Sequence, residues 1–93
     1  MTKELANAIL KAAETLKSFG ASEVYVFGSA ATGKLGPHSD IDMAVRGLPP
    51  ERFYEAYAKA VRCFDREMDL ISLDQENAFT RYLQEEGELR RVG

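Results

Sequence analysis

Thiols and imidazoles are scarce in this chain, which has one cysteine, Cys63, and one histidine, His38. A single thiol excludes an internal disulfide and a metal cage built from thiolates. No run of about 18 apolar residues occurs, which excludes a membrane-spanning helix of ordinary length. Because no signal peptide opens the chain, we expect a cytoplasmic protein.

Positive charge is also in short supply. Twelve Lys and Arg residues stand against fifteen Asp and Glu residues, for a formal net charge of −3 at pH 7. This balance argues against a protein held to nucleic acid by bulk electrostatics, which normally has a basic face. The 93 residues are 45% apolar and 29% charged, without an internal repeat or a linker, so we expect one globular domain spanning residues 1–93.

The most informative stretch runs from residue 24 to residue 45. A β-branched and aromatic run predicts a strand over Glu23–Phe27, and Gly28-Ser29 ends it. The ten residues 30–39 contain two glycines and a proline, which indicates a loop with one helical turn. Alternating apolar residues then predict a second strand over 41–46. Residues i and i+2 of a strand point the same way, so Asp40 and Asp42 are predicted to lie side by side.

Two adjacent carboxylates need a counter-charge. Like charges 4 Å apart repel by about 4 kcal/mol at an effective dielectric constant of 20. A divalent cation removes that cost, and ligands that are all oxygen suit Mg²⁺. Gly28 allows a phosphate to approach the main chain, and Ser29 offers a hydroxyl and an N–H. The combination favours phosphoryl or nucleotidyl transfer.

These residues resemble the signature of the DNA polymerase β-like nucleotidyltransferase superfamily: Gly28-Ser29, ten residues, then Asp40-x-Asp42. The short chain is most similar to the minimal nucleotidyltransferase (MNT) branch, whose members commonly act as the antitoxin beside a helical HEPN-type toxin. The resemblance covers nearly the whole chain, because the elements after residue 45 follow the family's order. It implies a nucleotidyltransferase fold of the α/β (α+β) class: a small mixed sheet flanked by helices, in the order helix, strand, loop, strand, helix, strand, helix.

A third carboxylate is expected opposite the Asp pair. Asp69 lies between Met68 and Leu70 in a predicted strand over 67–73, where a charge is out of place, and it matches the position of the family's third acid; Glu67 is the alternative. The resemblance implies that Asp40, Asp42 and Asp69 hold two Mg²⁺ ions, with ATP as substrate and Asp69 orienting or deprotonating an acceptor hydroxyl. The expected reaction transfers AMP to a tyrosine of a HEPN-type toxin.

One departure from the family pattern bears on activity. Arginines often follow the Gly-Ser pair in the family, whereas this chain has Ala30-Ala31-Thr32, leaving Lys34 as a substitute phosphate contact. Two alternative functions therefore stay open: an antitoxin that neutralises its partner by binding alone, and a small-molecule nucleotidyltransferase. A purely structural interpretation of the acids, as turn or solubility residues, and a homo-oligomer stay open as well.

The remaining segments predict scaffold elements. Thr2 is expected to cap a first helix that ends at Gly20, and Pro50 begins a later helix with Phe53 and Tyr57 on its apolar side. Asp74 is expected to cap a last helix over 75–86, with its apolar residues Phe79, Tyr82 and Leu83 turned inward. The polar tail, residues 88–93, is expected to be frayed.

Overall fold

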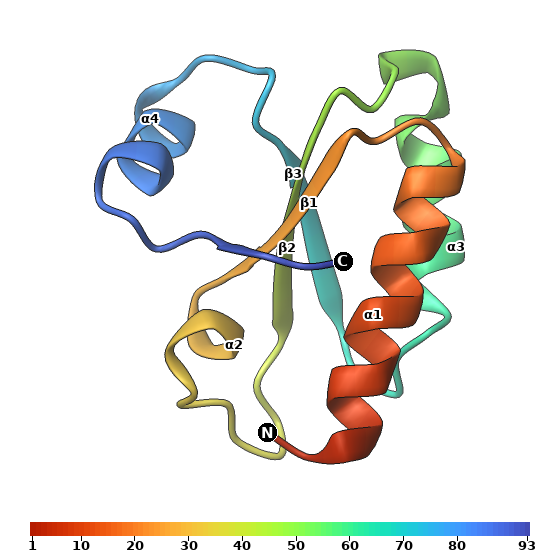
Figure 1. The fold of residues 1–93 in the computed structure, drawn as a ribbon, viewed down its shortest axis with the longest axis vertical. Coiled ribbons are helices and arrows are strands. Elements are labelled where there is room, and N and C mark those ends of the chain that lie inside the picture. The colour runs from red at the N-terminus through yellow and green to blue at the C-terminus, as the bar shows by residue number, and fades with distance from the viewer.

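A four-stranded mixed sheet forms the centre of the computed structural model, which describes residues 1–93 (Figure 1). The strand order is β3-β2-β1-β4. β1 pairs antiparallel with β2 and with β4, whereas β2 pairs parallel with β3. The strands are β1 (Glu23–Phe27), β2 (Ile41–Arg46), β3 (Met68–Ser72) and β4 (Arg90–Arg91). The positions of β1, β2 and β3 agree with the three strands predicted from the sequence, and the mixed sheet with its helices confirms the predicted α+β class.

The helices lie on both faces of the sheet, with α1 and α3 on one face and α4 on the other, while α2 lies at the end of the sheet and packs Ala30 and Ala31 into the main core (Figure 1). They are α1 (Lys3–Ser18), α2 (Ser29–Thr32), α3 (Phe53–Val61) and α4 (Ala78–Glu85), and a 3-10 turn, η1 (Pro50–Arg52), leads into α3. The Thr2 side chain accepts a hydrogen bond of 3.1 Å from Leu5 N, which confirms it as the cap of α1. The longest helix, α1, has 16 residues, and none of the helices combines the length and apolarity that crossing a membrane requires.

The two faces of the sheet bury different residues because side chains alternate along each strand. The face toward α1 and α3 is apolar throughout and makes the main core, with Val24, Val26, Ile41, Met43, Val45, Met68 and Leu70 all buried. On the opposite face, Leu83 of α4 packs with Phe27, Ala44 and Leu73 in a smaller cluster. This second face also carries Asp42, and Ala44 is fully buried at the next position. It is therefore apolar where α4 covers it and acidic at the end where α2 begins.

The start of α4 differs from the sequence prediction. Its cap is Asn77, which accepts a hydrogen bond of 2.9 Å from Thr80 N, and not Asp74. The Asp74 carboxylate instead accepts one of 2.8 Å from Gly47 N, so it joins two loops. Of the three apolar residues predicted to turn inward, Leu83 is buried, while Phe79 and Tyr82 are each 51% exposed. The inward orientation predicted for those two aromatic residues was wrong.

The predicted fraying of the tail was also wrong. Arg90 and Arg91 form a short strand beside β1, and Val92 N donates to Val24 O at 2.9 Å. Val92 packs against the main core, which anchors the strand. Lys17 Nζ also donates to the Gly93 carbonyl at 2.6 Å, so α1 holds the end of the chain. The tail completes the sheet on the side that β1 would otherwise leave unpaired.

Candidate functional site

Asp42 and Asp69 lie directly beside one another in the sheet. The parallel pairing of β2 with β3 puts the two residues in register. Asp69 is exposed and its two strand neighbours, Met68 and Leu70, are buried, so its side chain is on the face away from α1 and α3. Both acids are near the beginnings of their strands, at the same end of the sheet. The structure thus brings together two side chains that are 27 positions apart in the sequence.

Asp40 belongs to the same cluster of charge, although it precedes β2 and is exposed. Burial raises the pKa of Asp42, and the negative charges of Asp69 and Asp40 raise it further. Each of these causes disfavours the ionised carboxylate. Asp42 is therefore close enough to both of the other acids to be repelled by their charges. Glu67, the alternative third acid, is exposed just before β3, where its carbonyl accepts a hydrogen bond of 2.9 Å from Ile41 N.

The main chain at Gly28 lies against the carboxylate of Asp42. Gly28 has φ +63°, and a Cβ built on it would be 2.7 Å from Asp42 Oδ2. This close approach follows from the register, because Phe27 is paired with Asp42. Glycine is favoured at this position, since a side chain would press on the carboxylate and the backbone is in a region that L-residues avoid. The Gly-Ser pair thus lies directly beside Asp42.

Ser29 begins α2 directly beside this contact and is half-buried. The helical turn expected in the loop is therefore present, and the first amides of a helix lack partners within it. Lys34 follows α2, is exposed and forms no ion pair. Ala30, at the first position where the family often has arginine, is only 6% exposed.

Arg66, which the sequence analysis did not single out, tethers the loop that leads to the acids. Its Nη1 donates to the carbonyl oxygens of Gly36 and Ser39, at 3.1 Å each. Its side chain is 21% exposed, so these bonds are largely shielded from water. The loop is thereby fixed to the segment before β3 at the residue that precedes Asp40. No local sequence pattern reveals this contact, because Arg66 and Gly36 are 30 positions apart.

Tyr57 supports the third acid from α3. Its hydroxyl donates to Met68 O at 2.7 Å and lies 3.4 Å from Asp69 Oδ1. Burial and the charge of Asp69 raise the pKa of this phenol, so it stays a hydrogen-bond donor at neutral pH. The apolar pattern of the helix predicted an inward Tyr57, but not its contact with the acid.

The donor set fits a divalent cation in its chemistry. The residues present are carboxylates, which are hard oxygen ligands of the kind Mg²⁺ prefers, and their mutual repulsion is what a cation relieves. No group of three or more His, Cys, Asp or Glu side chains converges closely enough to form a ready-made metal site. The fit therefore rests on the paired Asp42 and Asp69, with Asp40 close by on the preceding loop.

The order of these parts can be compared with known proteins. A family model described as "Polymerase beta, Nucleotidyltransferase" matches residues 9–89. The chain belongs to this nucleotidyltransferase family. The range that matches the family model contains Gly28, Ser29 and all three acids. None of the curated proteins matches the chain.

Solved structures share the fold. A crystal structure of a toxin–antitoxin with AMP-PNP has 25% sequence identity and a TM-score of 0.71, covering 95% of this chain and 72% of that one. The toxin–antitoxin MntA–HepT has 21% identity and a TM-score of 0.63, covering 99% and 72%. A putative nucleotidyltransferase from Sulfolobus solfataricus has 16% identity and a TM-score of 0.50, covering 96% and 76%. These likenesses confirm the nucleotidyltransferase fold expected from the sequence.

Proposed function

We propose that this chain is a Mg²⁺-dependent nucleotidyltransferase that transfers AMP from ATP to a hydroxyl group, namely a tyrosine of a HEPN-type toxin. One observation carries the proposal: Asp42 and Asp69 are in register directly beside the Gly28 main chain, in a nucleotidyltransferase fold. An acid pair next to a small-residue turn is the arrangement that a triphosphate with a divalent cation requires.

Each residue has a defined role in this proposal. Asp42 and Asp69, with Asp40 beside them, ligate the cation, while Gly28 and Ser29 donate main-chain and hydroxyl hydrogen bonds to the phosphates. Lys34 is exposed without an ion pair, so it is available to a phosphate oxygen. Bound Mg²⁺ supplies charge neutralisation at the triphosphate and lowers the pKa of the acceptor hydroxyl. These residues mainly provide positioning and electrostatic stabilisation.

The proposed transfer balances as a simple displacement. The acceptor oxygen forms a bond to the α-phosphorus of ATP, and the bond from that phosphorus to the bridging oxygen of pyrophosphate breaks. Asp69 orients the hydroxyl and takes its proton, which suits a carboxylate that is exposed at the strand edge. Tyr57 holds Asp69 by its hydroxyl contact, and Arg66 holds the loop before Asp40.

The structural likenesses support a toxin as the partner. Two of the compared proteins are toxin–antitoxin structures, and one of them was crystallised with AMP-PNP, an analogue of ATP. The acceptor in this proposal is a tyrosine of that partner, as the resemblance to the MNT antitoxins implies.

A second function has one observation in its favour. Ala30 is buried and Thr32 is not cationic, so two of the usual phosphate contacts are missing. An antitoxin that acts by covering its partner, without chemistry, would need the fold and the surface but not the acids. The two functions differ in whether the acids are required.

The direct test incubates the chain with [α-³²P]ATP, Mg²⁺ and a candidate HEPN-type partner. We expect the label on the partner, with Asp42→Asn and Asp69→Asn reducing labelling by at least about 100-fold. Glu14→Gln, an exposed acid on α1, is the matched control and should label normally. An unlabelled partner would contradict the enzymatic proposal. If Asp42→Asn also protects cells as well as the wild type does, the binding function is the correct one.

A further inference from the structure

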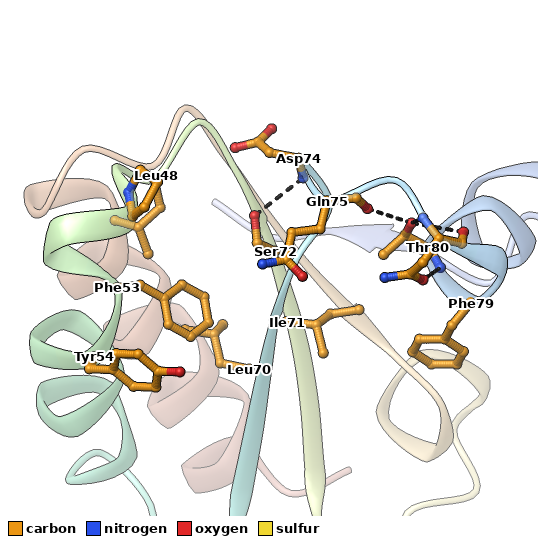
Figure 2. A pocket seen from close by; sticks show the side chains of 12 residues that line it. Leu48, Phe53, Tyr54, Leu70, Ile71, Ser72, Asp74, Gln75, Phe79 and Thr80 are labelled. Carbon is orange, nitrogen blue, oxygen red and sulfur yellow. Dashed lines mark hydrogen bonds between the residues drawn. The ribbon is translucent and has the colours of Figure 1, made fainter.

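A cleft of about 540 Å³ lies beside the proposed active site, at the outer edge of β3. β3 is the end strand on its side of the sheet, so no other strand covers that edge. Phe53 and Tyr54 of α3 line one wall and Phe79 of α4 the other, with Leu70 and Ile71 of β3 between them (Figure 2). The cleft therefore exposes the edge strand between two aromatic walls.

The walls of the cleft are unusually exposed for aromatic residues. The side chain of Tyr54 is 81% exposed and that of Phe79 is 51% exposed, and both rank among the few large exposed hydrophobic residues of the chain. Each ring makes an edge-to-face contact with a less exposed aromatic residue, Tyr54 with Phe53 and Phe79 with Phe27, and its remaining surface is open to solvent. Exposed aromatic residues that flank a hollow are typical of residues that dominate a protein interface.

The charge of the cleft selects the kind of partner. No lysine or arginine lines it, and its one charged residue is Asp74. Glu67, just before the edge strand that forms its floor, and Asp69, near the start of that strand, are exposed acids, and Glu76 is exposed in the loop beside the cleft. Charge complementarity therefore favours a basic segment.

The cleft is also continuous with the reactive end of the site. Leu70, which lines it, directly follows Asp69 in β3. A strand rises about 3.3 Å per residue, so Ser72 at the far end of the cleft is about 10 Å from Asp69 along the strand. An extended chain laid on this edge would place one side chain in the cleft and another, about three residues away, at Asp69.

We propose that the cleft docks an extended, basic segment of the partner protein that carries the acceptor hydroxyl. An apolar side chain of the segment fills the space between Tyr54 and Phe79, and the acceptor residue lies about three positions away, beside Asp69. This inference rests on the proposed transfer reaction, for which it supplies the acceptor-binding surface.

The test uses peptides of about ten residues and the full chain labelled with ¹⁵N. The first peptide has one leucine, a tyrosine three positions away, and lysine and serine elsewhere; the second replaces its lysines by glutamates. We expect the first to bind at least about tenfold more tightly and to shift the amide signals of residues 70–72. Tyr54→Ala should weaken binding about tenfold, whereas Tyr82→Ala, on α4 but outside the cleft, should not.

Failure of this inference can be told apart from failure of the proposed function. Thermal stabilisation by Mg²⁺ with ATP reports on the acid site alone and should be the same for wild type, Tyr54→Ala and Tyr82→Ala. If that stabilisation is present but the two peptides bind equally, or the shifts lie away from β3, the docking proposal is overturned. If the stabilisation is absent and the lysine peptide still binds at the cleft, the docking surface stands and the catalytic proposal falls.

Discussion

The close contact between Gly28 and Asp42 makes the replacement of Gly28 by alanine a sharp test of the site. The backbone at Gly28 has φ +63° and ψ −140°, a region that costs an L-residue about 1–3 kcal/mol. The new Cβ would also be 2.7 Å from Asp42 Oδ2. The carboxylate is the end of a side chain, so it rotates away from its preferred rotamer at a cost of about 0.5–1.5 kcal/mol. We expect Gly28→Ala to lose about 2–4 kcal/mol of unfolding free energy.

The displaced carboxylate should affect cation binding more strongly than stability. The matched control is Gly33→Ala, because Gly33 also has positive φ, at +76°, but nothing lies within 4 Å of its Cβ position. That variant should lose only the cost of the left-handed backbone, about 1–2 kcal/mol. Urea unfolding measures the stabilities, and calorimetric titration with Mn²⁺ measures the cation. We expect Gly28→Ala to weaken Mn²⁺ binding at least about tenfold and Gly33→Ala to leave it unchanged.

A double-mutant cycle separates the clash from the backbone strain. In an Asp42→Ala background the carboxylate is gone, so Gly28→Ala should cost less by about 0.5–1.5 kcal/mol than it does in the wild type. Additive costs would show that the two residues do not press on one another. Wild-type Mn²⁺ affinity in Gly28→Ala would refute the idea that this glycine keeps the Asp42 carboxylate in place.

Three further perturbations test the residues around the site. Asp42→Asn should raise the unfolding free energy at pH 7 in the absence of divalent cations, because the raised pKa of Asp42 means that its ionised form destabilises the fold. The gain should disappear below about pH 4, and urea unfolding at pH 7 and below pH 4 checks this. Arg66→Gln should cost about 1.5–3 kcal/mol by the same measurement, whereas the exposed Arg62→Gln should stay within about 0.5 kcal/mol, and equal effects would contradict the tether. Tyr57→Phe should cost about 0.5–1.5 kcal/mol and speed amide exchange in β3; unchanged exchange would contradict its support of that strand.

The parts of this fold that sequence predicted were those with a local pattern. β1 and β2 follow from short runs and period-two alternation, and α1 from its Thr2 cap and apolar spacing. The acids were singled out for a local reason too, since Asp69 is a charge between two buried strand residues. Their adjacency came from the resemblance, because only long-range pairing brings β2 beside β3.

The parts that sequence did not predict depend on competition or on distant contacts. Asp74 and Asn77 are both good helix caps, and the choice between them was made by Gly47 N, which binds Asp74 from another loop. β4 contains only Arg90 and Arg91, which have no strand pattern, and it forms because β1 has a free edge. The tether formed by Arg66 was not predicted either, because its partners Gly36 and Ser39 are distant in the sequence.

The incomplete cover that α4 gives to its face of the sheet unites the two proposals. If α4 extended over the whole face, Asp42 and Asp69 would be buried without a counter-ion, which the fold could not tolerate. Because only Leu83 of this helix is buried against Phe27 and Ala44, the acidic end of the sheet remains accessible to a nucleotide. The same short helix leaves Phe79 half exposed above the edge of β3. The limited cover that α4 gives to the sheet thus leaves accessible both the acids and the cleft on which the two proposals depend.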